Sequence, residues 1–166
     1  MKNLKKTGLA LLGFVLLGLS ACSKDEENNT VMTKDITDVA IADPQFSTLV
    51  SALTKANLVT ALKATGPFTV FAPNNTAFTK AGITSLDGIN NTDLTNILTN
   101  HVVSGEVMAA NVTSGTVPTL NSSSPIYISK NADGVFINGN IKVIATDVDA
   151  SNGVIHVIDT VLLPKQ

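Results

Sequence analysis

The sequence predicts an α+β domain in which helices come first and antiparallel strands follow. Apolar residues recur at helical spacing between residues 43 and 101. From Thr116 onwards they alternate with a period of two, between Asn-Gly and Asp-Gly dipeptides that suit tight turns. A block of helices followed by a block of strands is the pattern of α+β proteins.

The first 21 residues have the pattern of a cleavable export signal. Lys2, Lys5 and Lys6 form a basic head, and an uninterrupted apolar run extends from Gly8 to Leu19. A helix needs about 20 such residues to cross the hydrocarbon core, so this run is too short to span but suits a signal peptide. It ends in Leu19-Ser20-Ala21-Cys22, which resembles the lipobox that lipoprotein signal peptidases recognise.

Cys22 is the only cysteine in the chain, so it cannot form an internal disulfide. We therefore expect it to become the lipid-bearing N-terminus of the mature protein and to hold the protein to a membrane. The alternative is an ordinary secretory signal with a cysteine near the cut by chance. On the lipid interpretation the protein lies in the cell envelope.

Residues 22–33 form a predicted tether, because the stretch from Ser23 to Thr30 holds no apolar residue and cannot join a core. Its acidic cluster, Asp25 to Glu27, resembles a surface-export signal of lipoproteins in some Gram-negative lineages. The alternative is a plain solvated spacer. Ser23 directly after the cysteine argues against retention in the inner membrane. We expect anchoring in the outer membrane, with exposure at the surface.

The predicted domain covers residues 34–166, a length typical of one domain. Its first helix starts at Asp43-Pro44, since Asp caps helices well and Pro fits the first helical position. Asn57 suits the left-handed conformation that ends a helix. A short second helix, Leu58 to Leu62, is broken by Thr65-Gly66-Pro67. The apolar face of the first helix consists of Phe46, Leu49, Val50 and Leu53.

A strand from Phe68 to Ala72, closed by Pro73, precedes the third helix. Asn74 or Asn75 is expected to cap this helix, which runs through Ala81. Both residues have side-chain oxygens that can accept from the first free amides of a helix.

The fourth helix is predicted to begin with Thr92 as its cap. Val102-Val103 continue from it as a strand, and Ser104-Gly105 form a turn. The apolar face of this helix consists of Leu94, Ile97, Leu98 and His101.

Five strands are predicted in the second half, with tight turns between most of them. The turn dipeptides are Asp133-Gly134, Asn138-Gly139 and Asn152-Gly153. The strands are Ile126–Lys130, Val135–Ile137, Ile141–Val148, Val154–Ile158 and Val161–Leu163.

Three segments of the chain resemble the conserved motifs of fasciclin domains. Residues 66–78 are similar to the first motif, residues 100–105 to the central Tyr-His segment, and residues 152–164 to the second motif. They occur in the order and spacing of the family. The resemblance implies a fasciclin-like wedge of two β-sheets with several helices packed around it, and a role in adhesion or extracellular binding. It gives Asn74, His156 and Asp159 the role of structural motif residues.

The central segment departs from the family pattern. Asn100 stands where the family often has Tyr, and Ser104 where it often has Pro; Asn75 also replaces a frequent acidic residue. The Tyr-His segment of animal relatives is tied to integrin binding, and without the Tyr we do not transfer integrin recognition to this chain. Asn100 and His101 are nevertheless the partner-binding candidates that the resemblance suggests.

The sequence offers no catalytic residues, metal ligands or cofactor-binding loop. His101 and His156 are the two histidines, and neither belongs to a zinc-binding pattern. On a strand, His156 shares a face with Val154 and Ile158 while Asp159 points away, which argues against a Ser-His-Asp triad. We expect His156 to be a buried, hydrogen-bonded imidazole.

Charge and composition narrow the function further. The net charge is −2, and the mature chain is more acidic because three of the lysines lie in the signal. A chain without arginine and with excess carboxylates is a poor nucleic-acid binder. We therefore expect no enzyme but a membrane-anchored module for adhesion or extracellular binding, with a protein or glycan partner. The alternatives are an envelope-bound glycan or small-ligand carrier, or a hydrolase with an unrecognised site.

Overall fold

The computed structural model describes residues 34–164. The predicted export signal and tether, including Cys22, lie outside the described residues. The helical elements are α1 (Ile36–Ala42), the 3₁₀ turn η1 (Pro44–Phe46), α2 (Ser47–Lys55), α3 (Val59–Leu62), α4 (Asn75–Lys80) and α5 (Asn91–Asn100). The strands are β1 (Phe68–Pro73), β2 (Val102–Ser104), β3 (Gly115–Val117), β4 (Ile126–Asn131), β5 (Gly134–Ile137), β6 (Ile141–Ala150) and β7 (Gly153–Ile158).

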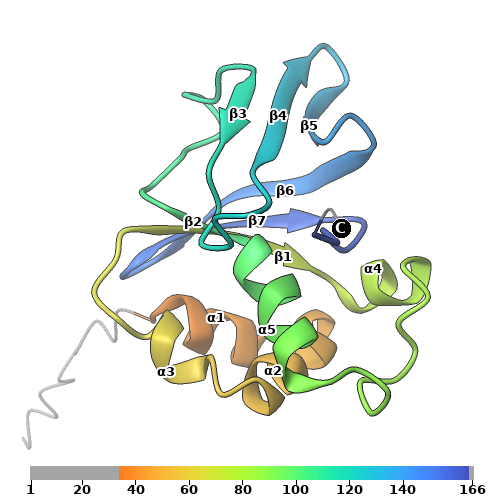
Figure 1. The fold of residues 1–166 in the computed structure, drawn as a ribbon. Coiled ribbons are helices and arrows are strands. Elements are labelled where there is room, and N and C mark those ends of the chain that lie inside the picture. The colour runs from red at the N-terminus through yellow and green to blue at the C-terminus, as the bar shows by residue number, and fades with distance from the viewer. Residues whose placement is uncertain (1–33, 165–166) are drawn as a thin grey trace, which may run out of the picture. The chain divides into compact units, whose positions relative to one another are not determined.

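The strands follow the order β2-β1-β7-β6-β5-β4-β3, so the α+β class is confirmed (Figure 1). Strand β6 belongs to two sheets. Its first residues pair with β5, and the rest, from Val143, pairs with β7 through two register shifts. Every pair is antiparallel except β1 with β7, which is parallel and was not predicted.

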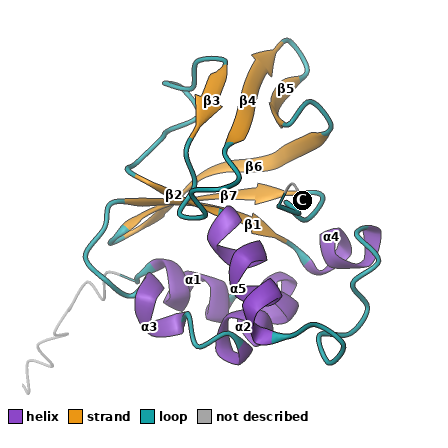
Figure 2. Ribbon diagram, in the orientation of Figure 1, coloured by secondary structure: helices purple, strands orange, loops and turns teal. Residues whose placement is uncertain are grey.

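The helices gather on one side of the β1–β7 pair, and the β3–β5 strands lie on the other (Figure 2). The central strands are therefore buried on both faces, as alternate residues show. Val70 and Ala72 of β1 pack into the helical core, whereas Phe71 between them packs with Ile137 and Ile158 in the second core.

Local capping chemistry places most helices where the sequence predicts them. Asp43 accepts from the amide of Gln45 at the start of η1, and Asn57 adopts a φ of 57° after α2. Asn74 rather than Asn75 caps α4, because its Oδ1 atom accepts from the amide of Ala77 at 2.8 Å.

Two predicted elements are wrong. Thr92 does not cap α5: the helix starts at Asn91, and Asn90 is the cap, with its Oδ1 atom 2.8 Å from the amide of Asp93. Residues 161–163 form no strand. The backbone of Leu162 bonds to two side chains instead of to a neighbouring strand. Helix α1 and strand β3 were not predicted.

The parallel contact between β1 and β7 depends on Gly153. A Cβ atom built there would lie 2.0 Å from the carbonyl oxygen of Phe68, and the residue has a φ of +152°. Only glycine allows the two backbones to approach this closely. At the predicted turn between β5 and β6, Asn138 and Gly139 both have positive φ, as the dipeptide indicated.

Candidate functional site

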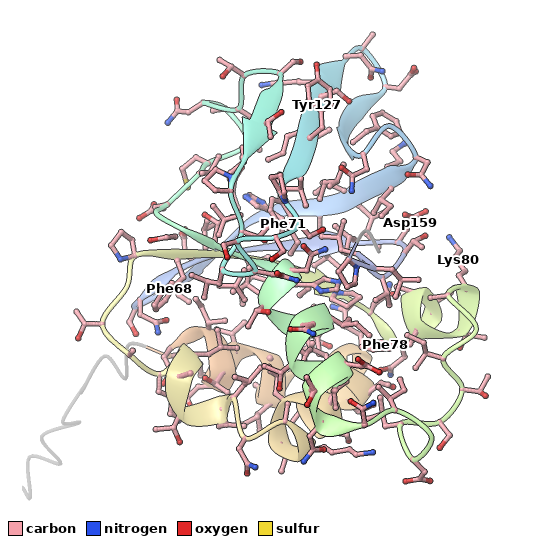
Figure 3. The ribbon with its side chains drawn as sticks, viewed as in Figure 1. Phe68, Phe71, Phe78, Lys80, Tyr127 and Asp159 are labelled. Carbon is pink, nitrogen blue, oxygen red and sulfur yellow. The ribbon has the colours of Figure 1, made fainter. Side chains whose placement is uncertain are left out.

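The two outer motif segments meet at the centre of the fold, where β1 and β7 pair with Phe71 opposite His156. Asp159 follows β7 and points towards Lys80 of α4 (Figure 3), with 3.1 Å between the Nζ and Oδ2 atoms. The other carboxylate oxygen accepts from the amide of Lys142 at 3.0 Å. Asp159 therefore ties α4, β6 and β7 together, as a structural motif residue would.

The pKa of Asp159 is lower than usual. Its partial burial disfavours the charged form, but the hydrogen bonds from the Lys80 ammonium and the Lys142 amide outweigh that effect. The carboxylate is thus charged at neutral pH and occupied by structural partners. Its pairing leaves it a poor candidate for proton transfer.

His156 is buried, as predicted, and both of its ring nitrogens are occupied. Its Nδ1 atom accepts from the amide of Asp147 at 3.2 Å, so the neutral ring carries its proton on Nε2 and donates it to the carbonyl of Val107 at 2.7 Å. The carboxylate of Asp147 accepts from the amide of Ala109 at 2.8 Å. His156 and Asp147 therefore fix the loop that follows β2.

The space beside His156 is too small for a ligand. The recess between the ring, Phe71 and Val107 holds about 10 Å³, no more than a single water needs. The ring of Phe71 lies 5.6 Å from the imidazole, centroid to centroid. This region is consequently a closed part of the core rather than a binding site.

Asn100 and His101 are also buried, with 1% and 2% of their surface exposed. Their side chains are therefore out of direct reach of a partner at the surface, and a role for them in partner binding stays a prediction. His101 is held between two backbone segments: its Nε2 atom accepts from the amide of Leu162 at 2.9 Å, and Nδ1 donates to the carbonyl of Ile97 at 2.8 Å. Asn100 donates to the carbonyl of Leu162 at 3.3 Å.

Burial lowers the pKa of His101 to about 4, and the Ile97 carbonyl offsets only part of that effect. The ring is therefore neutral at physiological pH. A proton on Nε2 would face the amide of Leu162, which is itself a donor, so the geometry also excludes the imidazolium from this arrangement.

A groove of about 760 Å³ opens next to this buried pair. Helix α5 contributes Asp93, Asn96 and Ile97 to the lining, and the C-terminal segment contributes Leu163, which is 54% exposed. Asn121 bridges towards α5 by donating to the carbonyl of Asn96 at 3.3 Å. The lining residues are Ala81, Ile83, Gly88, Ile89, Asp93, Asn96, Ile97, Asn121, Ser123, Ser124, Leu163 and Pro164.

The groove combines an aliphatic surface with amide, hydroxyl and carboxylate groups. Among the described residues that line the groove, Asp93 is the one that is ionisable, and its carboxylate also accepts from the side chain of Asn90 at 2.8 Å. Sequence reasoning missed the groove because four separate segments build it. Only Ile97, next to His101 on the predicted apolar face, pointed towards it.

The described part of the chain offers little for other kinds of site. Between residues 34 and 164, no three His, Cys, Asp or Glu side chains are grouped so that they could hold a metal ion. In the same range, none of the helices is both long and apolar enough to span a membrane.

Comparisons with known proteins agree with this architecture. The model of the fasciclin domain family matches residues 44–164. Protein sll1483 from Synechocystis is 43% identical, over 93% of this chain and 93% of its own. Immunogenic protein MPB70 from Mycobacterium bovis is 37% identical, over 80% of this chain and 71% of its own. The solved FAS1 domain pair from the insect cell adhesion molecule fasciclin I superposes with a TM-score of 0.65 at 23% identity, covering 78% of this chain and 51% of that chain, which shows a shared fold.

Proposed function

The chain belongs to the fasciclin domain family, and we propose that it is a lipid-anchored module of the cell envelope that binds a partner protein without catalysis. The observation that carries the proposal is the open groove of about 760 Å³ beside α5. The insect protein whose fold this chain shares is a cell adhesion molecule. We extend that role to this chain through its own surface.

The chemistry of the groove favours an extended polypeptide segment as the partner. Ile83, Ile89 and Leu163 offer aliphatic contacts for a side chain, and the amides of Asn96 and Asn121 suit a peptide backbone. None of the described residues that line the groove is aromatic, so they offer no ring on which a planar ligand could stack. Asp93 favours a neutral or basic segment over an acidic one.

Presentation on a membrane supports the same function. Two or three acyl chains on Cys22 would anchor the protein stably, and the tether would hold the domain away from the bilayer. The similarity to the Synechocystis protein covers more of the chain than residues 34–166 can supply, so it includes part of this N-terminal segment. Dense display can raise avidity by ~10²–10⁴ when the geometry permits.

The anchor is tested by Cys22→Ala in the full chain. We expect loss of palmitate labelling and of membrane fractionation, because acyl chains dominate attachment. A variant that remains labelled and membrane-bound would contradict the lipoprotein proposal.

The groove is tested by placing lysine at two exposed aliphatic positions. Leu163 lies in the groove and is 54% exposed, whereas Ile144 lies on β6 outside it and is 50% exposed. Cells displaying wild-type chain, Leu163→Lys, Ile144→Lys or no chain are compared on a panel of host and bacterial surfaces, with and without chelator. We expect Leu163→Lys to reduce adhesion about tenfold, Ile144→Lys to leave it unchanged, and chelator to have no effect.

Two results would overturn this function. Cells that lack the protein could adhere as well as wild-type cells across the panel, or the purified protein could turn over a defined substrate. Adhesion that survives protease treatment of the target surface would reassign the partner to a glycan.

A further inference from the structure

Leu162, in the C-terminal segment, is fixed by hydrogen bonds with side chains, although it belongs to no strand. It is completely buried, and side chains satisfy both of its backbone groups. The imidazole of His101 accepts from its amide at 2.9 Å, and the amide of Asn100 donates to its carbonyl at 3.3 Å. The residues that follow, Leu163 and Pro164, line the groove.

Asn100 also lies beside Thr119, a buried residue that bonds to the loop of the groove. Its Oδ1 atom lies 3.4 Å from the hydroxyl of Thr119. That hydroxyl is also within hydrogen-bond distance of the carbonyls of Asn121 and Ser124, at 2.9 and 3.1 Å. Asn121 and Ser124 belong to the loop that lines the groove beside α5. The hydroxyl has one proton to donate, and the carbonyl of Asn121 is its nearest acceptor. The amide of Asn100 therefore bonds directly to the C-terminal wall and lies against Thr119, the residue that bonds to the loop.

We propose that Asn100 and His101 are positioning residues that set the shape of the groove by holding Leu162 and by contacting Thr119, without touching the partner. This inference rests on the proposed function of the groove. The ring of His101 is itself fixed, because Nδ1 donates to the carbonyl of Ile97, and Ile97 also lines the groove. Three groove-lining segments thus converge on the same buried pair.

An asparagine is well suited to position 100. Its side chain donates to the carbonyl of Leu162, and its oxygen lies 3.4 Å from the hydroxyl of Thr119. A side chain with only a donor or only an acceptor would lack one of these two contacts. The pair therefore couples the partner surface to residues that no partner can reach.

The test compares His101→Leu with His156→Leu in the full chain. Each variant replaces a buried imidazole that bridges two backbone segments, but only His101 contacts a groove wall. The measurements are hydrogen exchange at the amide of Leu162, relative to amides of β1, and adhesion to the surface that wild-type cells bind. His101→Gln is the conservative variant, since its amide oxygen can accept where Nε2 does.

We expect His101→Leu to speed exchange at Leu162 at least tenfold relative to β1 and to weaken adhesion about fivefold. His101→Gln should restore much of both, and Asn100→Ser should show a milder form of the same defect. His156→Leu should leave the relative exchange at Leu162 and the adhesion near wild-type values. This should hold even if its melting temperature falls as much as that of His101→Leu.

Unchanged relative exchange at Leu162 in His101→Leu would overturn the inference, as would equal loss of adhesion in His156→Leu. If wild-type cells adhere to no surface, the proposed function fails instead. Exchange at Leu162 then decides alone whether the pair holds this wall.

Discussion

The two buried histidines hold two regions of very different character. His156 lies in the central β1–β7 pair, beside a recess that is closed to ligands, and carries its proton on Nε2. His101 lies behind the open groove, carries its proton on Nδ1 and holds a segment outside the sheet. Both bridge a carbonyl of one segment and an amide of another. A buried imidazole therefore stabilises the centre of the sheet in one region and the backbone beside the groove in the other.

The central region should be the less tolerant of the two, and Gly153→Ala tests this most severely. The added methyl group would meet the Phe68 carbonyl at 2.0 Å, where backbone rather than a flexible side chain must move. We expect a loss of at least about 4 kcal/mol of unfolding free energy, in the range of rare, severe substitutions. Gly88→Ala is the control, because nothing lies within 4 Å of its added methyl group. A melting curve of Gly153→Ala that matches Gly88→Ala would contradict the close contact.

The pH dependence of stability tests the surroundings of His101 next. The imidazole at position 101 titrates near 6.5 in the unfolded chain but near 4 in the folded protein. Between these values the unfolded state binds more protons, so the contribution is fully present above about pH 6.5 and is lost as pH falls towards 4. The loss amounts to about 3 kcal/mol. His101→Gln should lack this component when its denaturant unfolding is compared with wild type across the range; parallel curves would contradict it.

His156→Ala should have an effect of intermediate size. It removes the acceptor for the Asp147 amide and the donor to the Val107 carbonyl, a change that costs about 1–3 kcal/mol. We expect a clearly lower melting temperature and faster hydrogen exchange in residues 105–109, with adhesion retained in cells at a temperature where the variant is folded. An unchanged melting curve together with lost adhesion would instead make His156 a functional residue.

The smallest effect is expected at the Lys80–Asp159 ion pair. The side chain of Lys80 is 51% exposed, so Lys80→Met should cost less than about 1 kcal/mol. The difference should shrink in high salt, because exposed charges are screened. Urea unfolding of wild type and variant at low and high salt measures it. A large, salt-independent loss would show that Lys80 contributes through packing.

Elements governed by neighbouring residues could be predicted from the sequence. The Asn74 cap, the left-handed Asn57 and the Asn138-Gly139 turn each follow from one side chain acting on adjacent backbone. The error at α5 is instructive, since Thr92 and Asn90 both suit a cap. Asn90 prevails because its amide group also donates to the Asp93 carboxylate, which the first turn provides.

Features that join distant segments could not be predicted in this way. The apolar run at residues 161–163 has the pattern of a strand, but Leu162 is paired with side chains about sixty positions earlier. The contacts of Asn75 were not predicted either: its side-chain amide donates to the carbonyl of Pro44 and accepts from the backbone amide of Thr48. The groove belongs to this class, because its four lining segments come together only in the folded chain.

The proposed function requires that the groove is the surface that contacts the partner. Photo-crosslinking from living cells tests this directly, with the reactive residue placed at Asn96 in the groove or at Ile144 on β6, both of which are exposed. We predict a defined crosslinked protein from position 96 on the surface to which the cells adhere, and none from position 144. A crosslink from position 144 alone, or the same product from both positions, would contradict the assignment of the groove.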